Sequence, residues 1–258
     1  MANNKKSLKS ESRTAVTLTE YLKEKGRSHN HYKTYSKMER IIPIRDNLNL
    51  YLGSPSTWND KVDRKQFLND SAYRYFIKCF SFSAEESMAM WMLYGGIDNK
   101  GGMIDFSKKG INSILQAKEI TLGKFDNGFQ PIKKLTNENF EIYITDVLYY
   151  KDYKENKKGC FVKRSDESCY NRSARVLAKL FGCKKSYPWE YENECRMIIK
   201  LDKNLVPADC TDAEIDLSQM DLGVSLKRVY HSPNYPLDDK KGTTRSSIFD
   251  TVDWDLIK

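Results

Sequence analysis

The residues best suited to chemistry lie between Trp189 and Leu201, where glutamates alternate with other residues up to an arginine. If this segment is one β-strand, as its alternation predicts, every second side chain lies on the same face. Glu190, Glu192, Glu194 and Arg196 would then form one row, in which Arg196 neutralises only its neighbour. The repulsion that remains costs stability unless a ligand or cation offsets it, so the row is a candidate site. The alternative is an edge strand whose charged outer face is solvated and discourages aggregation.

Two further segments carry candidate ligand contacts. A helix is predicted from Ala84 to Tyr94, capped by Ser83 and ended by two glycines, and it places the Tyr94 ring where it could reach a pocket. Core packing is the alternative role for that ring. Asn59 and Asp60, which follow a Gly-Ser-Pro turn, either close a loop or present a polar pair to a ligand.

Alternation, capping residues and turn signals predict the elements that position these residues. The predicted strands cover residues 31–35, 48–52, 75–82, 102–106, 140–150, 189–201 and 226–231, and the predicted helices cover residues 17–25, 84–94, 111–117 and 167–181. No repeat or Pro/Gly/Ser linker divides the chain. We therefore expect a basic N-terminal arm over residues 1–28 and a single α+β domain over residues 29–258.

Composition argues against several classes of protein. The 258 residues are 40% hydrophobic and 30% charged, and their mean hydropathy of −0.68 is more polar than average, but an aromatic content of 12% argues against disorder. No apolar run is long enough to cross a membrane, and the N-terminus lacks the apolar segment of a signal peptide. The six cysteines form no Cys-x-x-Cys pair, so we expect reduced thiols and no metal site. These features predict a cytoplasmic protein with no membrane partner.

The net charge of +8 is unevenly distributed along the chain. Residues 1–40 carry ten Lys/Arg against four acids, residues 151–185 carry eleven against four, and residues 201–258 carry seven against eleven. The two basic segments could form a surface that attracts the phosphates of a nucleic acid or a dinucleotide. The alternative is that the arm and one helix face are simply solvated.

Five motifs in order give the chain a resemblance to a large family of bacterial domains of unknown function, over roughly residues 31–200. The motifs are Tyr32-Lys33-x-Tyr35, Leu50-Tyr-Leu-x-Ser54-Pro-x-x-Trp58-Asn59-Asp60, Cys79-Phe-Ser81, Met90-Trp91-x-x-Tyr94 and Trp189-x-Tyr-Glu192-x-Glu194-x-Arg196. That family is in turn similar to the ADP-ribosyltransferase superfold, which includes nucleic-acid-modifying toxins of the DarT type. The resemblance implies a split β-sheet core with flanking helices.

The same resemblance implies roles for particular residues. Glu194 would be the catalytic carboxylate, and Glu192 would orient the acceptor. Tyr94 would be the aromatic residue beside the nicotinamide of NAD. Lys33 stands where the superfold has a first-strand histidine or arginine that holds NAD, and His31 lies two residues earlier as the other candidate.

The chemistry of ADP-ribosyl transfer accounts for these residue types. Breaking the bond between ribose and nicotinamide develops positive charge at the anomeric carbon, which a fixed carboxylate stabilises. A second carboxylate orients or deprotonates the acceptor, cationic side chains bind pyrophosphate, and an aromatic face packs on nicotinamide. The implied NAD contacts are Tyr32, Lys33, Tyr35, Ser54, Asn59, Asp60, Tyr94 and Arg196.

The leading expectation is therefore an NAD-dependent ADP-ribosyltransferase, acting as a bacterial toxin or phage-defence effector. Its acceptor would be a nucleic acid or a protein, and an antitoxin is a possible partner. One alternative is a Mg²⁺-dependent nuclease, with Asp60 or Asp63 added to the Glu-x-Glu pair, although the lysine usual in such strand motifs is absent. The other is a non-enzymatic nucleic-acid-binding or regulatory module whose acidic strand pairs with a basic partner.

Overall fold

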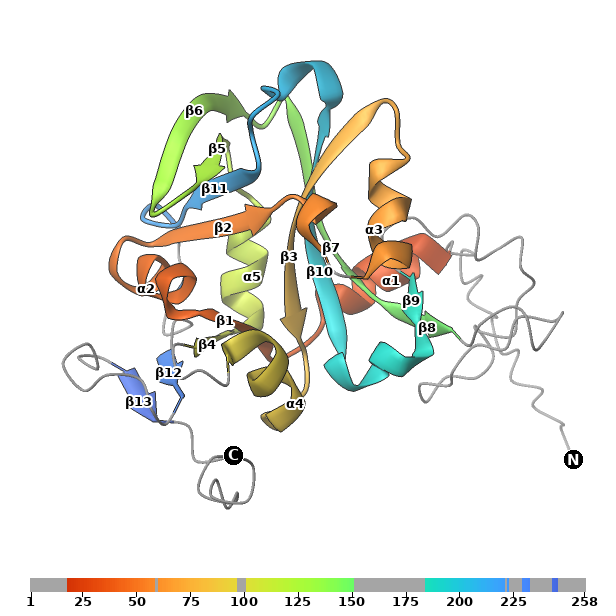
Figure 1. Ribbon diagram of the computed structural model, residues 1–258, viewed down its shortest axis with the longest axis vertical. Coiled ribbons are helices and arrows are strands. Elements are labelled where there is room, and N and C mark those ends of the chain that lie inside the picture. The colour runs from red at the N-terminus through yellow and green to blue at the C-terminus, as the bar shows by residue number, and fades with distance from the viewer. Residues whose placement is uncertain are drawn as a thin grey trace, which may run out of the picture.

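A computed structural model describes residues 18–58, 60–96, 101–150, 184–220, 222, 229–232 and 243–245 (Figure 1). The helices are α1 (Leu18–Gly26), α2 (Met38–Asp46), α3 (Lys61–Leu68), α4 (Met88–Met90) and α5 (Lys108–Ile114), with short 3₁₀ turns η1 (Pro55–Thr57), η4 (Tyr187–Glu192) and η5 (Lys203–Leu205) and a π-helix, η2 (Trp91–Gly96). The strands are β1 (Tyr32–Lys37), β2 (Asn49–Gly53), β3 (Tyr73–Ser81), β4 (Gly101–Phe106), β5 (Glu119–Phe125), β6 (Phe129–Thr136), β7 (Phe140–Asp146), β8 (Leu148–Tyr150), β9 (Lys184–Ser186), β10 (Glu194–Asp202), β11 (Asp212–Asp216), β12 (Val229–His231) and β13 (Thr243–Arg245). This mixture of helices with a mostly antiparallel sheet is compatible with the predicted α+β class.

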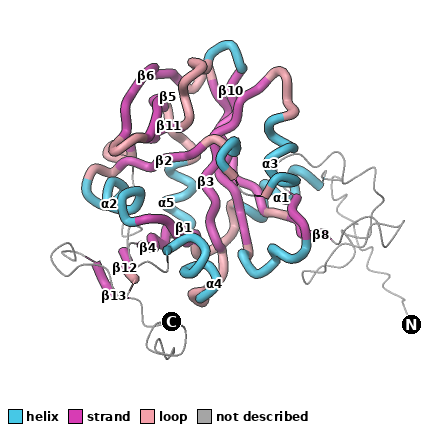
Figure 2. Tube along the Cα trace, in the orientation of Figure 1, coloured by secondary structure: helices cyan, strands magenta, loops and turns pink. Residues whose placement is uncertain are grey.

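The main sheet divides at β3. One edge of β3 pairs with β10 along its whole length, and β10 pairs in turn with β7. The other edge meets β1 only at Ser81 and β2 only at Ile77, and each of these strands continues into its own run of strands. Figure 2 shows β3 in the centre, with β2 and β1 leaving it in different directions. The strand is therefore the point where the parts of the sheet join.

Alternation along β3 and β10 places one face in the main core, and the other face has a polar end beside a second apolar cluster that includes Ile77 and Ile198. One side of the two strands packs into the main core with residues of β2 and α5, among them Phe76, Phe80, Cys195, Met197, Ile199, Leu50, Leu52, Ile111 and Ile114. The opposite side carries Glu194 beside Ser81 and Arg196 beside Cys79, because these residues are cross-strand partners. A single strand pair thus anchors the core and presents charged groups on its other face.

Several predicted elements are confirmed, with shifted ends. The strands predicted at 31–35, 48–52, 75–82 and 102–106 correspond to β1, β2, β3 and β4. The predicted helix 111–117 begins earlier, at Lys108, because Ser107 caps it by accepting a hydrogen bond from the backbone N–H of Gly110. The predicted strand 140–150 is divided into β7 and β8, which belong to different sheets.

Two predictions near the candidate site were wrong in detail. The long strand predicted from Trp189 begins only at Glu194, because residues 187–192 form a 3₁₀ turn. The three glutamates therefore do not form one row on a strand. The alternative edge-strand reading was also wrong, since β10 lies between β3 and β7. The helix predicted from Ala84 begins at Met88, where Ser87 rather than Ser83 is the cap.

Part of the predicted N-terminal arm is a helix packed on the domain. The side chain of Leu22 in α1 is buried, and a Cβ on Gly26 would approach the backbone of Thr145 in β7 to 2.9 Å. Lys23 pairs with Glu141 of β7 at 3.2 Å. The rest of the arm, residues 1–17, and the predicted helix 167–181 lie outside the described residues. No helix in the described part of the chain is long and apolar enough to span a membrane.

Candidate active site

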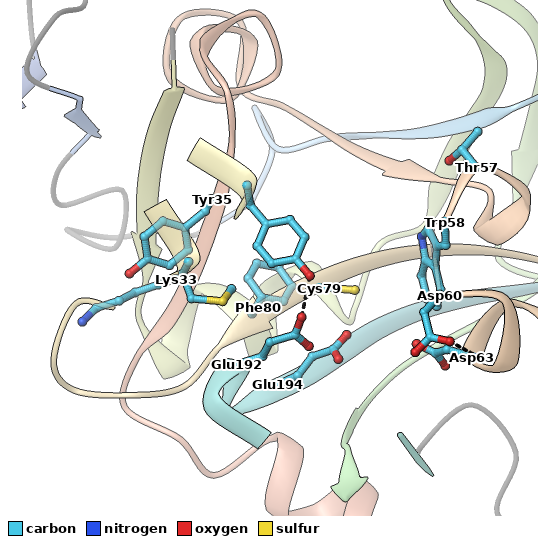
Figure 3. Close-up of a pocket in the computed structure, with 12 residues that line it drawn as sticks. Lys33, Tyr35, Thr57, Trp58, Asp60, Asp63, Cys79, Phe80, Glu192 and Glu194 are labelled. Carbon is cyan, nitrogen blue, oxygen red and sulfur yellow. Dashed lines mark hydrogen bonds between the residues drawn. The ribbon is translucent and has the colours of Figure 1, made fainter. Parts of the chain in front are cut away.

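A cavity of about 410 Å³ opens on the polar face of β3 and β10 (Figure 3). Its walls come from β1, the turn and helix after β2, the end of β3, the α4–η2 segment and the start of β10. The lining residues are Lys33, Tyr35, Thr57, Trp58, Asp60, Asp63, Cys79, Phe80, Met90, Tyr94, Glu192 and Glu194. In Figure 3, Lys33 and Tyr35 lie on one side of the two glutamates, and Trp58 and Asp60 lie on the other.

Glu192 and Glu194 reach the cavity from either side of a backbone reversal. Asn193, between them, has a φ of 45°, in the left-handed region that asparagine tolerates better than most residues. Its backbone N–H donates to the Glu190 carbonyl at 3.1 Å, and its carbonyl accepts from Phe82 at 2.9 Å. This turn lets the last residue of η4 and the first of β10 both line the cavity, at only 2% and 3% exposure.

The Arg196 guanidinium lies directly behind Glu194. Its Nε and one terminal nitrogen donate to the two carboxylate oxygens of Glu194 at 2.8 and 3.1 Å. The other edge donates to both oxygens of Asp63, at 2.9 and 2.6 Å. Burial opposes the charge of Arg196, but the carboxylates of Glu194 and Asp63 outweigh it and raise the Arg196 pKa well above its usual value. The cation is therefore held permanently between two carboxylates.

Helix α3 delivers Asp63 to this pair. The helix begins at Asp60, whose side chain accepts from the backbone N–H groups of Val62 and Asp63 at 2.9 and 3.1 Å. Asp63 follows in the first turn, and the Gln66 side chain donates to its carboxylate. Asp60 thus acts as a helix cap while it also lines the cavity.

Tyr94 contacts Glu192 from the opposite wall. Its hydroxyl donates to Oε1 of Glu192, drawn as a dashed line in Figure 3. Burial and the neighbouring carboxylate raise the Tyr94 pKa well above that of a free phenol, so the hydroxyl keeps its proton and remains a donor. The residue lies on the π-helix η2, a form that is rare and often occurs at functional sites.

Lys33 lines the end of the cavity nearest Tyr35. Its side chain is only 5% exposed, and its ammonium donates to the carbonyl of Ala84. His31, the other candidate for the first-strand anchor, pairs with Asp105 at 2.7 Å and does not line the cavity. Of the two candidates, the structure brings only Lys33 to the carboxylates' cavity.

The structure gathers six of the ten predicted site residues around the cavity and leaves three away from its surface. Glu192, Glu194, Lys33, Tyr35, Asp60 and Tyr94 line it, and Asn59 lies outside the described residues. Tyr32 is fully buried, with its hydroxyl donating to the Gly26 carbonyl at 2.7 Å, and Ser54 caps η1. Arg196 has no exposed surface, so it holds Glu194 and does not face a ligand directly.

Sequence reasoning assigned no ligand role to Trp58, Cys79 or Phe80, and it considered Asp63 only as a metal ligand. Trp58 and Cys79 lie within two of the motifs that carry the family resemblance. Their membership of those motifs was the sequence signal that could have identified them as residues of the cavity wall. Among the residues that the structure describes, no three His, Cys, Asp or Glu side chains are placed to share a metal ion.

Comparison with known proteins gives one partial match. The model of a family described as a protein of unknown function, DUF2971, matches residues 90–197, a span that includes Tyr94, Glu192, Glu194 and Arg196. The match supports the resemblance to an uncharacterised family of domains. No curated protein and no solved structure matches the chain.

Proposed function

We propose that the protein is an NAD-dependent ADP-ribosyltransferase in which Glu194 is the catalytic carboxylate. The observation that carries the proposal is the state of Glu194. It is 3% exposed, lines a cavity with aromatic walls, and has both oxygens fixed by the Arg196 guanidinium. A carboxylate oxygen is the type of acceptor that would bind a ribose hydroxyl.

The reaction breaks the bond between C1′ of the ribose and the nicotinamide nitrogen. The bonding electrons stay on that nitrogen, so nicotinamide leaves as a neutral molecule and positive charge develops on the ribose. A carboxylate that is already oriented and poorly solvated stabilises this charge without reorganising. The acceptor then bonds to C1′ and gives its proton to Glu192, the other glutamate that lines the cavity.

The remaining walls suit the other parts of NAD. Tyr35, Trp58 and Tyr94 line the cavity and offer aromatic rings on which nicotinamide can pack. The Lys33 ammonium has three N–H donors, of which one bonds to Ala84, so two remain for a pyrophosphate oxygen. The volume of about 410 Å³ falls in the range of small-molecule sites.

Two further features favour this reaction over the alternatives. The main sheet divides at β3, and a divided sheet is compatible with the split core that the resemblance implies. The carboxylates of Asp63 and Glu194 both bind a guanidinium, whereas a Mg²⁺ site would need their oxygens to converge on an ion.

We assign the acceptor to nucleic acid in preference to protein, and the biological role to a toxin or defence effector with a possible antitoxin. The net charge of +8 supports a polyanionic partner. Helix α3, which forms one wall of the cavity, carries Lys61, Arg64 and Lys65 around the buried Asp63. Phosphates bound there would lie next to the cavity.

The test is incubation with NAD labelled in the adenosine part, together with RNA, DNA and lysate protein as acceptors. Released nicotinamide is measured by chromatography. We expect label in one acceptor pool and its loss in Glu194→Gln, which keeps the side-chain shape and leaves Arg196 balanced by Asp63.

Glu190→Gln is the matched control. Glu190 belongs to the same acidic run but does not line the cavity, so this variant should keep activity. Folded wild-type protein that releases no nicotinamide would contradict the proposal. Cleavage of nucleic acid that needs Mg²⁺ and ignores NAD would favour the nuclease, and salt-sensitive binding without turnover would favour the binding module.

A further inference from the structure

Asp63 takes no part in the steps of the proposed reaction. It lies in the first turn of α3, its side chain is 2% exposed, and both its oxygens accept hydrogen bonds from Arg196. Glu194 binds the other edge of the same guanidinium. The planar cation is therefore fixed from two sides, by a helix and by a strand.

Charge balance alone does not account for Asp63. One carboxylate neutralises one guanidinium, so Glu194 would suffice for Arg196. Asp63 is a second carboxylate on the same guanidinium, and none of the three residues is more than 4% exposed. Burying a carboxylate costs free energy, and the paired hydrogen bonds from Arg196 offset that cost.

The geometry shows what the extra carboxylate does. With Glu194 alone, the guanidinium and the carboxylate could swing together about their side-chain bonds. Asp63 prevents this because it is itself fixed, by its backbone N–H bond to Asp60 at 3.1 Å and by the Gln66 side chain. The rings of Trp58 and Phe67 lie 5.0 and 5.9 Å from the guanidinium carbon and close the remaining space.

We propose that Asp63 is a positioning residue that holds Glu194 in its reactive orientation through Arg196. The inference rests on the proposed function, because it assigns Asp63 a part in the same reaction. It also links two regions of the site: Asp60, which lines the cavity, positions Asp63, and Asp63 positions the cation behind Glu194. Movement of the wall formed by Trp58 and Asp60 would therefore change the alignment of the catalytic carboxylate.

The test is the steady-state kinetics of nicotinamide release by Asp63→Asn. Asparagine keeps the shape of the side chain, and Glu194 still pairs with Arg196, so the variant should fold. We expect kcat to fall by roughly 10–100-fold with KM changed less than about threefold, because a misplaced catalytic group affects the transition state more than substrate binding. Asp63→Glu restores the charge and should recover part of kcat.

Asp70→Asn is the matched control for a purely structural aspartate. Asp70 follows the same helix and accepts hydrogen bonds from Ala72, Tyr73 and Tyr75 outside the cavity. Its replacement should lower the melting temperature and leave kcat unchanged. Wild-type kcat in Asp63→Asn, or no recovery in Asp63→Glu, would overturn the positioning role.

A second measurement separates this inference from the proposed function. In protein labelled with ¹³C at the glutamate carboxyl groups, the Glu194 resonance is identified by its loss in Glu194→Gln. It should shift in Asp63→Asn and stay in place in Asp70→Asn. An unmoved resonance would show that Asp63 does not act on Glu194, whether or not NAD is consumed. Wild-type protein without NAD turnover would instead overturn the proposed function and the reaction role of Asp63 with it.

Discussion

Tyr94 donates a hydrogen bond to Glu192 across the cavity, although 98 residues separate the two along the chain. The contact joins the π-helix η2 to the turn before β10, so both walls of the cavity meet at one buried carboxylate. In the proposed reaction, Glu192 receives the acceptor's proton. The Tyr94 hydroxyl, which orients this carboxylate, should therefore affect the rate of transfer to the acceptor more than the rate of NAD cleavage.

Replacing Tyr94 with Phe tests that distinction. The variant keeps the ring that packs near nicotinamide and removes only the donor to Glu192. We expect transfer to the acceptor to fall by roughly 10-fold while nicotinamide release falls less, because general acid–base groups contribute about 10²–10⁴-fold and Glu192 itself remains. Losing a hydrogen bond to a charged group should also cost about 1.5–3 kcal/mol of stability. Equal losses of transfer and release would contradict the division of roles between Glu192 and Glu194.

Asn193 is the second test, because its left-handed backbone sets the direction of both glutamates. Asn193→Gly should keep activity, since glycine adopts this conformation freely. Asn193→Ala should lose about 1–2 kcal/mol and most of the transferase activity. Asn127, in the β5–β6 turn, has a φ of 50° and provides the control: Asn127→Ala should cost similar stability and leave transfer intact. Urea unfolding and NAD turnover, measured on all three variants, decide between the outcomes.

Arg196 should tolerate no substitution on its own. Removing the cation leaves Asp63 and Glu194 buried with no guanidinium to bind them, so Arg196→Met should cost about 3–5 kcal/mol. Arg196→Lys should recover little of this, because an ammonium cannot bind two carboxylates in bidentate fashion. The triple variant with Asp63→Asn and Glu194→Gln removes all three charges and should fold. An Arg196→Met protein as stable as wild type in urea would show that the cluster is not held by these ion pairs.

A fourth prediction concerns pH and Lys78 on the core side of β3. Burial lowers the pKa of Lys78 to about 8, and the Arg40 charge adds to the effect. The unfolded chain keeps the ordinary lysine value of 10.5 and so binds more protons than the folded chain between about pH 8 and pH 10.5. Stability should therefore rise with pH across this window through Lys78.

Lys78→Met should accordingly be more stable than wild type at pH 7, and the difference should shrink towards pH 10.5. The measurement is a series of urea unfolding curves at fixed ionic strength. Lys108→Met, at an exposed position in α5, should show little difference at any pH. A gap between Lys78→Met and wild type that stays constant with pH would rule out titration of Lys78 as its cause.

Local sequence signals predicted the strands and the candidate carboxylates better than they predicted the geometry between them. Alternation identified β1 to β4 because each has one face in the core. The whole run of glutamates was assigned to a strand. The 3₁₀ turn that precedes Asn193 was missed, because such a turn produces no periodic pattern in the sequence. The helices α2 and α3 and the β5–β6 hairpin were missed. Helix α2 contains Pro43, a residue that usually argues against a helix, and α3 is largely polar.

The partners of Arg196 show where prediction from local patterns ended. Glu194 lies two residues away on the same strand, so its pairing was expected from the sequence. Asp63 lies 133 residues away, and only the docking of α3 on the sheet brings it to the guanidinium. Tyr94 and Lys33 were chosen by resemblance, and the structure places both on the cavity wall. Tyr32, the residue before Lys33 in β1, lies on the other face of that strand and packs in the core.

The strands that build the site are synthesised in an order that leaves the site incomplete until late in translation. A ribosome makes β1, β3 and the walls around Trp58 and Tyr94 long before it reaches Glu192 and Glu194. Until β10 emerges and pairs with β3, a nascent chain holds the surroundings of the site without Glu192 and Glu194. The proposed reaction therefore cannot begin before the ribosome has passed residue 202.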